Sequence, residues 1–93
     1  MTSKTGRMAT DRAARYAKQL ASHWERKTEQ ATADDATILT FESGNVVVLR
    51  PADGVLEVEV SVADGGDLDR FAQVVADHLQ RFGQRDELEV TWS

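Results

Sequence analysis

VLEVEVSV, residues 55–62, alternates apolar and polar side chains with a period of two. Successive side chains of a β-strand point to opposite faces of its sheet, so one face of this strand is apolar and the other carries Glu57, Glu59 and Ser61. A sheet with one covered face and one face open to water is typical of antiparallel α+β proteins. The segment therefore predicts a strand that packs on helices through one side.

Two further strands are predicted immediately before this one. ATILTF (36–41) and NVVVLR (45–50) show β-strand patterns, and the short loop between them, residues 42–44, suits a hairpin. Residues 51–54, Pro-Ala-Asp-Gly, predict the turn into residues 55–62, because proline fixes one φ angle and glycine is free to take a positive one.

The segment before these strands predicts an amphipathic helix. Thr10-Asp11 offers an N-cap, since a side-chain oxygen there can accept from the free N–H groups of the first turn. The helix is expected to fade near Arg26-Lys27, where cations suit the negative end of its dipole. Apolar residues recur at helical spacing and form one stripe: Ala13, Tyr16, Ala17, Leu20 and Trp24.

A second helix is predicted within residues 64–83. Asp67 is its expected cap, and Gly83 is expected to end it in a left-handed conformation. Its apolar stripe consists of Leu68, Phe71, Ala72, Val75, Leu79 and Phe82. ELEVTW (87–92) then closes the chain as a strand with Leu88, Val90 and Trp92 facing inward.

Two other segments give weaker strand signals. Residues 5–9 are short and polar and are interpreted as an edge strand. Residues 28–35, TEQATADD, are consistent with a frayed strand that ends in a turn at Asp34-Asp35, and the pattern leaves open whether that strand forms.

Together these segments predict one α+β domain over residues 1–93. Its single sheet is mainly antiparallel and has four to six strands in the order β-α-β-β-β(-β)-α-β. Two helices cover one face, an arrangement that buries both apolar stripes and the apolar side of the strands.

Composition narrows the classes of function. The chain has 93 residues, no cysteine and a formal net charge of −5. Without cysteine there is no disulfide, thiol nucleophile or thiolate metal site. The polar start resembles no signal peptide, and no stretch approaches the ~20 apolar residues that span a bilayer. A cytoplasmic protein without membrane contact is expected.

The charge is divided unevenly along the chain. Residues 1–30 carry seven Lys or Arg against three Asp or Glu, whereas residues 31–93 carry four against thirteen. The split indicates either an anion-binding half or two halves that attract each other within one fold. Nucleic acid is an unfavourable partner, because the acidic remainder repels phosphate and the strands lack the aromatic pattern of RNA-binding sheets.

Two motifs resemble those of a bacterial family, domain-of-unknown-function family 2218. They are ATDRAARYAKQLASHW (9–24) and VADHLQRFGQRDELEVTW (75–92), so the resemblance extends over nearly the whole chain. The resemblance implies no known activity. It assigns motif positions to Arg12, Arg15, Tyr16, Lys18, Gln19, Leu20, His23, His78, Leu79, Arg81, Phe82, Arg85 and Glu87.

The polar motif residues suggest a ligand site. On a helical wheel, one flank of the first helix carries arginines, Gln19 and His23, with Lys18 nearly opposite, and His78 lies at the rim of the second stripe. If the helices are neighbours, both histidines face one groove. Arginine binds carboxylate or phosphate with two hydrogen bonds. The predicted site, for a small anion, consists of Arg12, Arg15, Gln19, His23, His78 and Arg81.

The same residues allow several alternatives. The histidines can be boundary residues, and the arginines can pair with Asp86, Glu87 or Glu89 to join helix to sheet. No catalytic or metal-ligand motif is present, so a non-enzymatic binding or accessory module without a cofactor is expected, acting on a small anion or a protein partner. The runner-up is a small enzyme or a metal- or iron-linked factor that uses His23 and His78. The acidic sheet face and an unpaired edge strand predict a homodimer.

Overall fold

The computed structural model describes residues 2–83 and 88–92. Six strands and two helices follow one another in the predicted order. Their bounds are β1 Thr2–Ala9, α1 Ala13–His23, β2 Thr28–Ala33, β3 Ala36–Phe41, β4 Val46–Ala52, β5 Val55–Val62, α2 Leu68–Phe82 and β6 Val90–Trp92.

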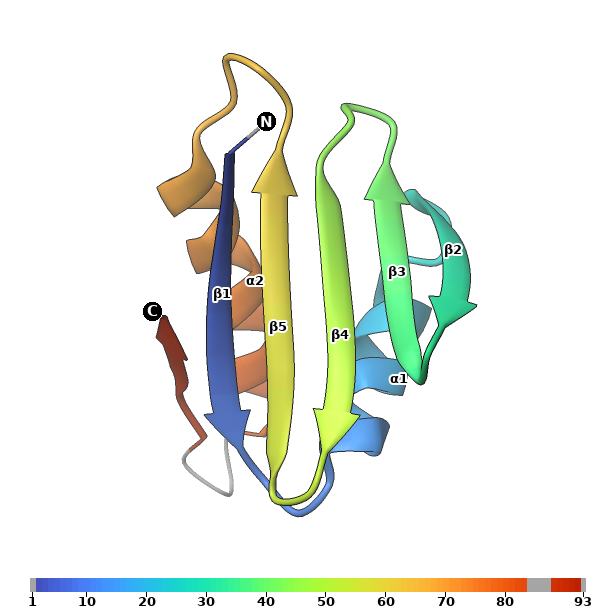
Figure 1. The fold of residues 1–93 in the computed structure, drawn as a ribbon, viewed down its shortest axis with the longest axis vertical. Coiled ribbons are helices and arrows are strands. Elements are labelled where there is room, and N and C mark those ends of the chain that lie inside the picture. The colour runs from blue at the N-terminus through green and yellow to red at the C-terminus, as the bar shows by residue number, and fades with distance from the viewer. Residues whose placement is uncertain (1, 84–87, 93) are drawn as a thin grey trace.

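The strands form one six-stranded antiparallel sheet with the spatial order β2-β3-β4-β5-β1-β6. Both helices lie behind it in Figure 1, α1 behind the β3–β4 half and α2 behind the β5–β1 half, so one face is covered and the other is open. The predicted α+β class, with two helices on one face of a mainly antiparallel sheet, is confirmed. Neither described helix is long and apolar enough to cross a membrane.

The core lies between the sheet and the helices. The alternation in β5 is confirmed, since Leu56, Val58 and Val60 are fully buried. From the helices, Leu20 and Leu79 are equally inaccessible. Trp24 is buried as well, whereas the C-terminal strand contributes partly buried side chains. The two stripes read from the sequence are therefore the surfaces that the sheet buries.

Residues 28–33 form a regular strand, which answers the question that the sequence left open. β2 pairs with β3 along its whole length, from Thr28 opposite Phe41 to Ala33 opposite Ala36. The predicted turn at Asp34-Asp35 is confirmed, with φ values of 50° and 68°. Two consecutive positive φ values are the signature of a type I′ hairpin turn, which tolerates aspartate.

The first strand is longer than expected and is not an edge strand. β1 begins at Thr2 and pairs with β5 on one side and β6 on the other. The return of the C-terminal strand to β1 is a long-range pairing, and the local pattern of residues 5–9 carries no sign of it. The N-terminal segment is therefore interior to the sheet.

Three predicted element ends are also wrong. Helix α1 begins after Arg12, which makes no side-chain cap bond, while Thr10 Oγ1 accepts from the backbone N–H of Arg12 at 3.1 Å. It ends at His23, before the expected Arg26-Lys27. Strand β4 continues through Pro51 to Ala52, so that Asp53 and Gly54 alone form the turn.

Gly83 has a φ of −101°, so it is not the left-handed residue expected there. A Cβ atom at this position would overlap the Leu88 side chain, which gives the glycine a packing reason in place of a conformational one. The predicted cap of α2 is confirmed, because Asp67 Oδ1 accepts from Arg70 N at 3.1 Å. Residue 87, the expected start of the last strand, lies outside the described residues, and β6 begins at Val90.

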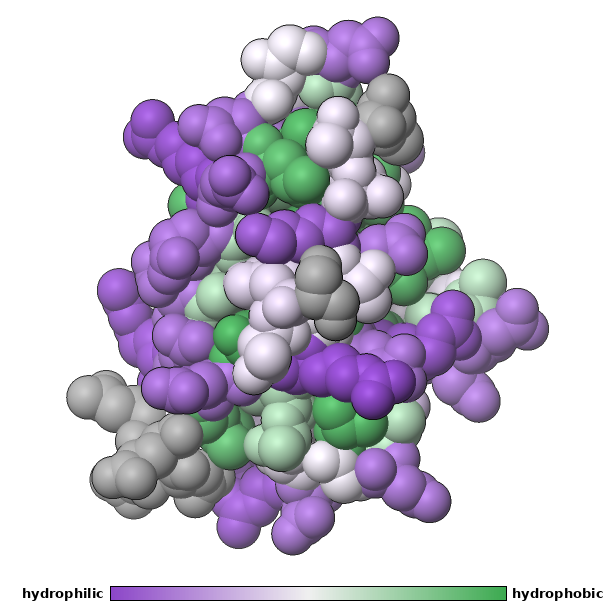
Figure 2. All heavy atoms as spheres, turned by 60° about the vertical axis from the view of Figure 1, so that its left-hand side comes forward, coloured by the Kyte–Doolittle hydropathy of each residue, from purple (hydrophilic) through white to green (hydrophobic). Residues whose placement is uncertain are grey.

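The open face of the sheet is mixed in charge. The register places Glu57 of β5 between Arg7 of β1 and Arg50 of β4, while Glu59 lies beside Thr5. Arginines thus interrupt the face that the sequence suggested to be acidic. Seen from the β1 side, the surface is largely hydrophilic with apolar atoms in small separated areas (Figure 2). Among the described residues, Val74 is the one large apolar side chain classed as exposed.

Candidate functional site

The two histidines meet where the helices approach each other. The ring centroids of His23 and His78 are 4.9 Å apart, with the rings tilted by 52°. Trp24 lies 4.9 Å from His78, and Phe82 lies 5.9 Å from His23. Residues 55 positions apart in sequence therefore share one aromatic cluster. The helical wheels placed each histidine at the rim of its stripe and left open whether the helices are neighbours.

Several backbone contacts fix this cluster in place. His78 Nδ1 lies 2.7 Å from the carbonyl oxygen of Val74, which can only accept, so Nδ1 carries the proton and donates. Gln30 Nε2 donates to Ala21 O at 2.6 Å, and the carbonyl of Trp24 accepts from Thr28 at 2.7 Å. The last turn of α1, which carries His23, is thereby joined to β2.

A shallow depression of about 450 Å³ adjoins His23. Five of its lining residues come from α1 and one, Phe82, comes from α2. The full lining consists of Arg15, Lys18, Gln19, Ser22, His23 and Phe82. It presents two cationic side chains, amide and hydroxyl hydrogen-bonding groups, and aromatic surface. No carboxylate is among these described lining residues, so its charge is positive.

The structure brings together part of the predicted site. Arg15, Gln19 and His23 line the depression, and His78 contacts it through the His23 ring. Arg12 lies apart, in a separate hollow with Thr10, Asp11 and Leu88. Arg81 is exposed on the last turn of α2 and is not among the lining residues described.

Lys18, Ser22 and Phe82 were not selected from the sequence as site residues. Lys18 was placed opposite the arginine flank, but it is only ~60° from Arg15 on the wheel. Its long side chain reaches the same hollow. Phe82 was assigned to the core, and it is partly buried there while its ring also borders the depression. The helical spacing of Arg15, Lys18 and Ser22 was the available signal.

The alternative role of the arginines, pairing with acidic residues to join helix to sheet, finds limited support. Over residues 2–83 and 88–92, the one ion pair is Lys4 Nζ to Asp69 Oδ1 at 3.3 Å. Neither Arg12 nor Arg15 pairs with Glu89 within this range. Asp86 and Glu87, the other two suggested partners, lie outside the described residues, as does the motif residue Arg85.

The metal alternative rests on the histidine pair alone. Within the described part of the chain, no group of three or more His, Cys, Asp or Glu side chains lies close enough together to hold an ion. Every buried side-chain nitrogen or oxygen described has a hydrogen-bond partner, so no orphaned buried ligand points to a missing group.

Comparison with known proteins places the chain in a family. A family model described as an uncharacterised protein conserved in bacteria, DUF2218, matches residues 5–93. The chain belongs to the DUF2218 family. The resemblance read from the two terminal motifs is therefore confirmed, and the matched range includes every residue of the predicted site.

A solved structure supports the same fold. The NMR structure of PA4090 from Pseudomonas aeruginosa matches with a TM-score of 0.74 and 29% sequence identity, over 100% of this chain and 96% of that one. No curated protein matches the DUF2218 chain. The family model thus establishes the family and the solved structure supports the fold, and neither assigns an activity.

Proposed function

We propose that this DUF2218 protein is a cytoplasmic, non-enzymatic binding module that takes a small anion in the depression between α1 and α2. The observation that carries the proposal is the lining itself, in which Arg15 and Lys18 face the same hollow as His23 and no described lining residue is a carboxylate. A site built for a cation would show the opposite charge. The cysteine-free sequence fits a cytoplasmic location.

Each lining residue has a chemical role in this proposal. Arg15 offers a planar fork that matches two oxygens of a phosphate or carboxylate, and Lys18 supplies a second charge. Gln19 and Ser22 donate neutral hydrogen bonds. Phe82 and the His23 ring provide an apolar wall for the uncharged part of a ligand. The class of ligand is therefore a compact anion with some apolar surface.

The shallow geometry limits the affinity. Arg15, Lys18 and His23 are all exposed, and exposed charge pairs contribute only ~0.2–1 kcal/mol each. Three such contacts total at most ~3 kcal/mol, which corresponds to a dissociation constant of roughly 5–10 mM or weaker for a bare anion. Tighter binding requires a ligand that also covers the aromatic wall.

The proposal is tested by titrating inorganic phosphate and benzoate into the protein while recording amide NMR shifts. Arg15→Gln and Lys18→Gln are expected to weaken binding about two- to fivefold each, because each removes one exposed charge from the lining. Arg70→Gln, which removes an exposed charge from α2 away from the hollow, is the matched control and is expected to bind as the unchanged protein does. Equal affinities in all three variants would overturn the assignment.

A metal-linked factor is the second candidate, and the histidine geometry favours it. Two imidazoles on one tetrahedral zinc ion have ring centres about 5 Å apart, given Zn–N bonds of about 2.0–2.1 Å. His23 and His78 are separated by 4.9 Å, and the Nδ1 donation to Val74 leaves His78 Nε2 as the lone-pair nitrogen. Equilibrium dialysis against zinc and ferrous ion distinguishes the two candidates. Retention of one ion per chain by the unchanged protein, and its loss in His78→Ala, would favour the metal-linked factor over anion binding.

A further inference from the structure

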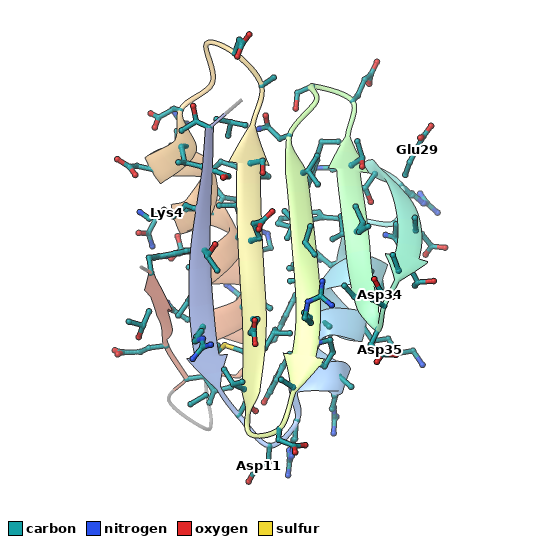
Figure 3. The ribbon with its side chains drawn as sticks, viewed as in Figure 1. Lys4, Asp11, Glu29, Asp34 and Asp35 are labelled. Atoms are coloured by element: carbon teal, nitrogen blue, oxygen red, sulfur yellow. The ribbon has the colours of Figure 1, made fainter. Side chains whose placement is uncertain are left out.

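The outer edge of the sheet is an unpaired strand with opposite charges at its two ends. Strand β2 pairs with β3 on one side and ends the sheet on the other. It is preceded by Arg26-Lys27 and followed by Asp34-Asp35. Figure 3 shows Glu29 toward one end of β2 and the two aspartates at the turn at the other end. All four flanking charged residues are exposed, and none forms an ion pair with another described residue.

The strand offers backbone groups for pairing. In a two-residue antiparallel hairpin, the residues that flank the turn form a hydrogen-bonded pair, here Ala33 with Ala36. Ala33, Ala31 and Glu29 therefore direct their backbone N–H and C=O groups to β3, and the residues between them direct theirs outward, namely Thr28, Gln30 and Thr32. The strand contains no proline and pairs with β3 without a bulge, so these outward groups are open to pairing with another strand.

We propose that β2 pairs antiparallel with β2 of a second copy of this chain, so that two sheets join into one. A two-fold axis perpendicular to the sheet keeps the helices of both copies on the same side, and it requires outward residues to face outward residues. Registers centred on Gln30 or on Ala31 meet this condition. The first brings Arg26 opposite Asp34 of the second copy, and the second brings Lys27 opposite Asp35.

The charges at the two ends of β2 indicate that its partner is a second copy of this chain. Antiparallel pairing sets the cationic end of each β2 against the acidic end of the other, twice per dimer. Parallel pairing would set like charges together at both ends. Glu29, the one charged residue within the strand, faces alanines in either antiparallel register. The edge is therefore complementary to itself in one orientation.

At the Asp34-Asp35 turn, the nearby arginine binds the backbone and leaves the acidic side chains available for pairing. Arg50 Nη1 donates to the backbone carbonyl of Asp34 at 2.9 Å, so this cation crosses the open face to the turn without engaging the carboxylate. The β2 side chains that face the helices are likewise fixed from within, through Gln30 to Ala21. Pairing with a second copy therefore requires neither of these hydrogen bonds to break.

Six residues of paired edge make a small interface, below the ~1,200 Å² of a standard one, so the dimer is expected to be weak and sensitive to salt. Sedimentation velocity of the intact chain from about 10 μM to about 1 mM should show a monomer–dimer equilibrium that shifts to monomer in ~0.5 M NaCl. A monomer throughout this range at low salt would overturn the proposal.

Charge variants locate the interface. R26E/K27E makes both ends repulsive and is expected to weaken self-association by about tenfold or more. R12E/R70E changes the net charge by the same amount near the helix N-termini and is the matched control, with association unchanged. A mixing experiment uses D34N/D35N, in which asparagine replaces each aspartate and tolerates the positive φ of the turn. Mixing this variant with R26E/K27E should restore pairing, since the mixed dimer has one attractive pair of strand ends and no repulsive pair. Equal association of both charge variants, or no gain on mixing, would place the contact elsewhere and refute β2 pairing.

Discussion

Replacement of Gly6 by alanine tests how the C-terminal strand is held on the sheet. A Cβ atom at Gly6 would lie 2.6 Å from Trp92 Cε3 and 2.9 Å from Cζ3. Ordinary contact begins near 3.4 Å, so the indole must move by roughly 0.8 Å. Overpacking of this kind costs ~1–3 kcal/mol. Alanine in place of a strand glycine recovers ~0.5–1 kcal/mol.

The expected net loss is about 1 kcal/mol, at the low end because Trp92 is only partly buried and can shift with its short strand. Urea unfolding monitored by circular dichroism measures this loss, which corresponds to ~4–8 °C in melting temperature for a chain of this size. The matched experiment repeats Gly6→Ala in a Trp92→Leu background, where the penalty should vanish. An unchanged or increased stability of Gly6→Ala alone, or an equal penalty in both backgrounds, would refute the steric argument.

Two further stability predictions concern the ends of α2. Gly83→Ala should destabilise the fold by ~1–3 kcal/mol, because the new methyl group overlaps Leu88, and Leu88→Ala in the same chain should relieve most of the added penalty; thermal melts of the three variants check this. Asp67→Ala should cost about 1 kcal/mol of stability, because it leaves Arg70 N without its acceptor, whereas Asp67→Asn should retain most of the stability. If the unchanged protein and both variants unfolded at the same urea concentration, the capping role would be contradicted.

The fold could be predicted from the sequence because its signals are local. Alternation in residues 55–62 and the two helical stripes each report directly which side chains are buried. The errors arise where a distant segment decides the outcome. β1 is interior because β6 returns to it, and Gly83 is required by a leucine five positions later. β2 forms although its side chains are polar, because the tight Asp34-Asp35 hairpin pairs it with β3.

The candidate site was predictable in part for the same reason. Helical spacing was sufficient to place Arg15, Gln19 and His23 on one side of α1, and to bring His78 to the rim of α2. Helical spacing was insufficient for Arg12, because this residue precedes the first turn of α1 and lies in a separate hollow. The start of the helix depends on the loop before it, which a helical wheel does not describe. Contacts between helices cannot be read from either helix alone. Phe82 therefore became visible as a lining residue only in three dimensions.

The most direct test of anion binding is a two-dimensional amide NMR titration of the unmodified protein with phosphate, benzoate and a short oligonucleotide. Saturable shifts for phosphate or benzoate are expected to gather on Arg15, Lys18, Gln19 and Ser22, with a smaller response near His78. Shifts that never saturate, or that spread evenly over exposed lysines and arginines, would contradict a site between α1 and α2.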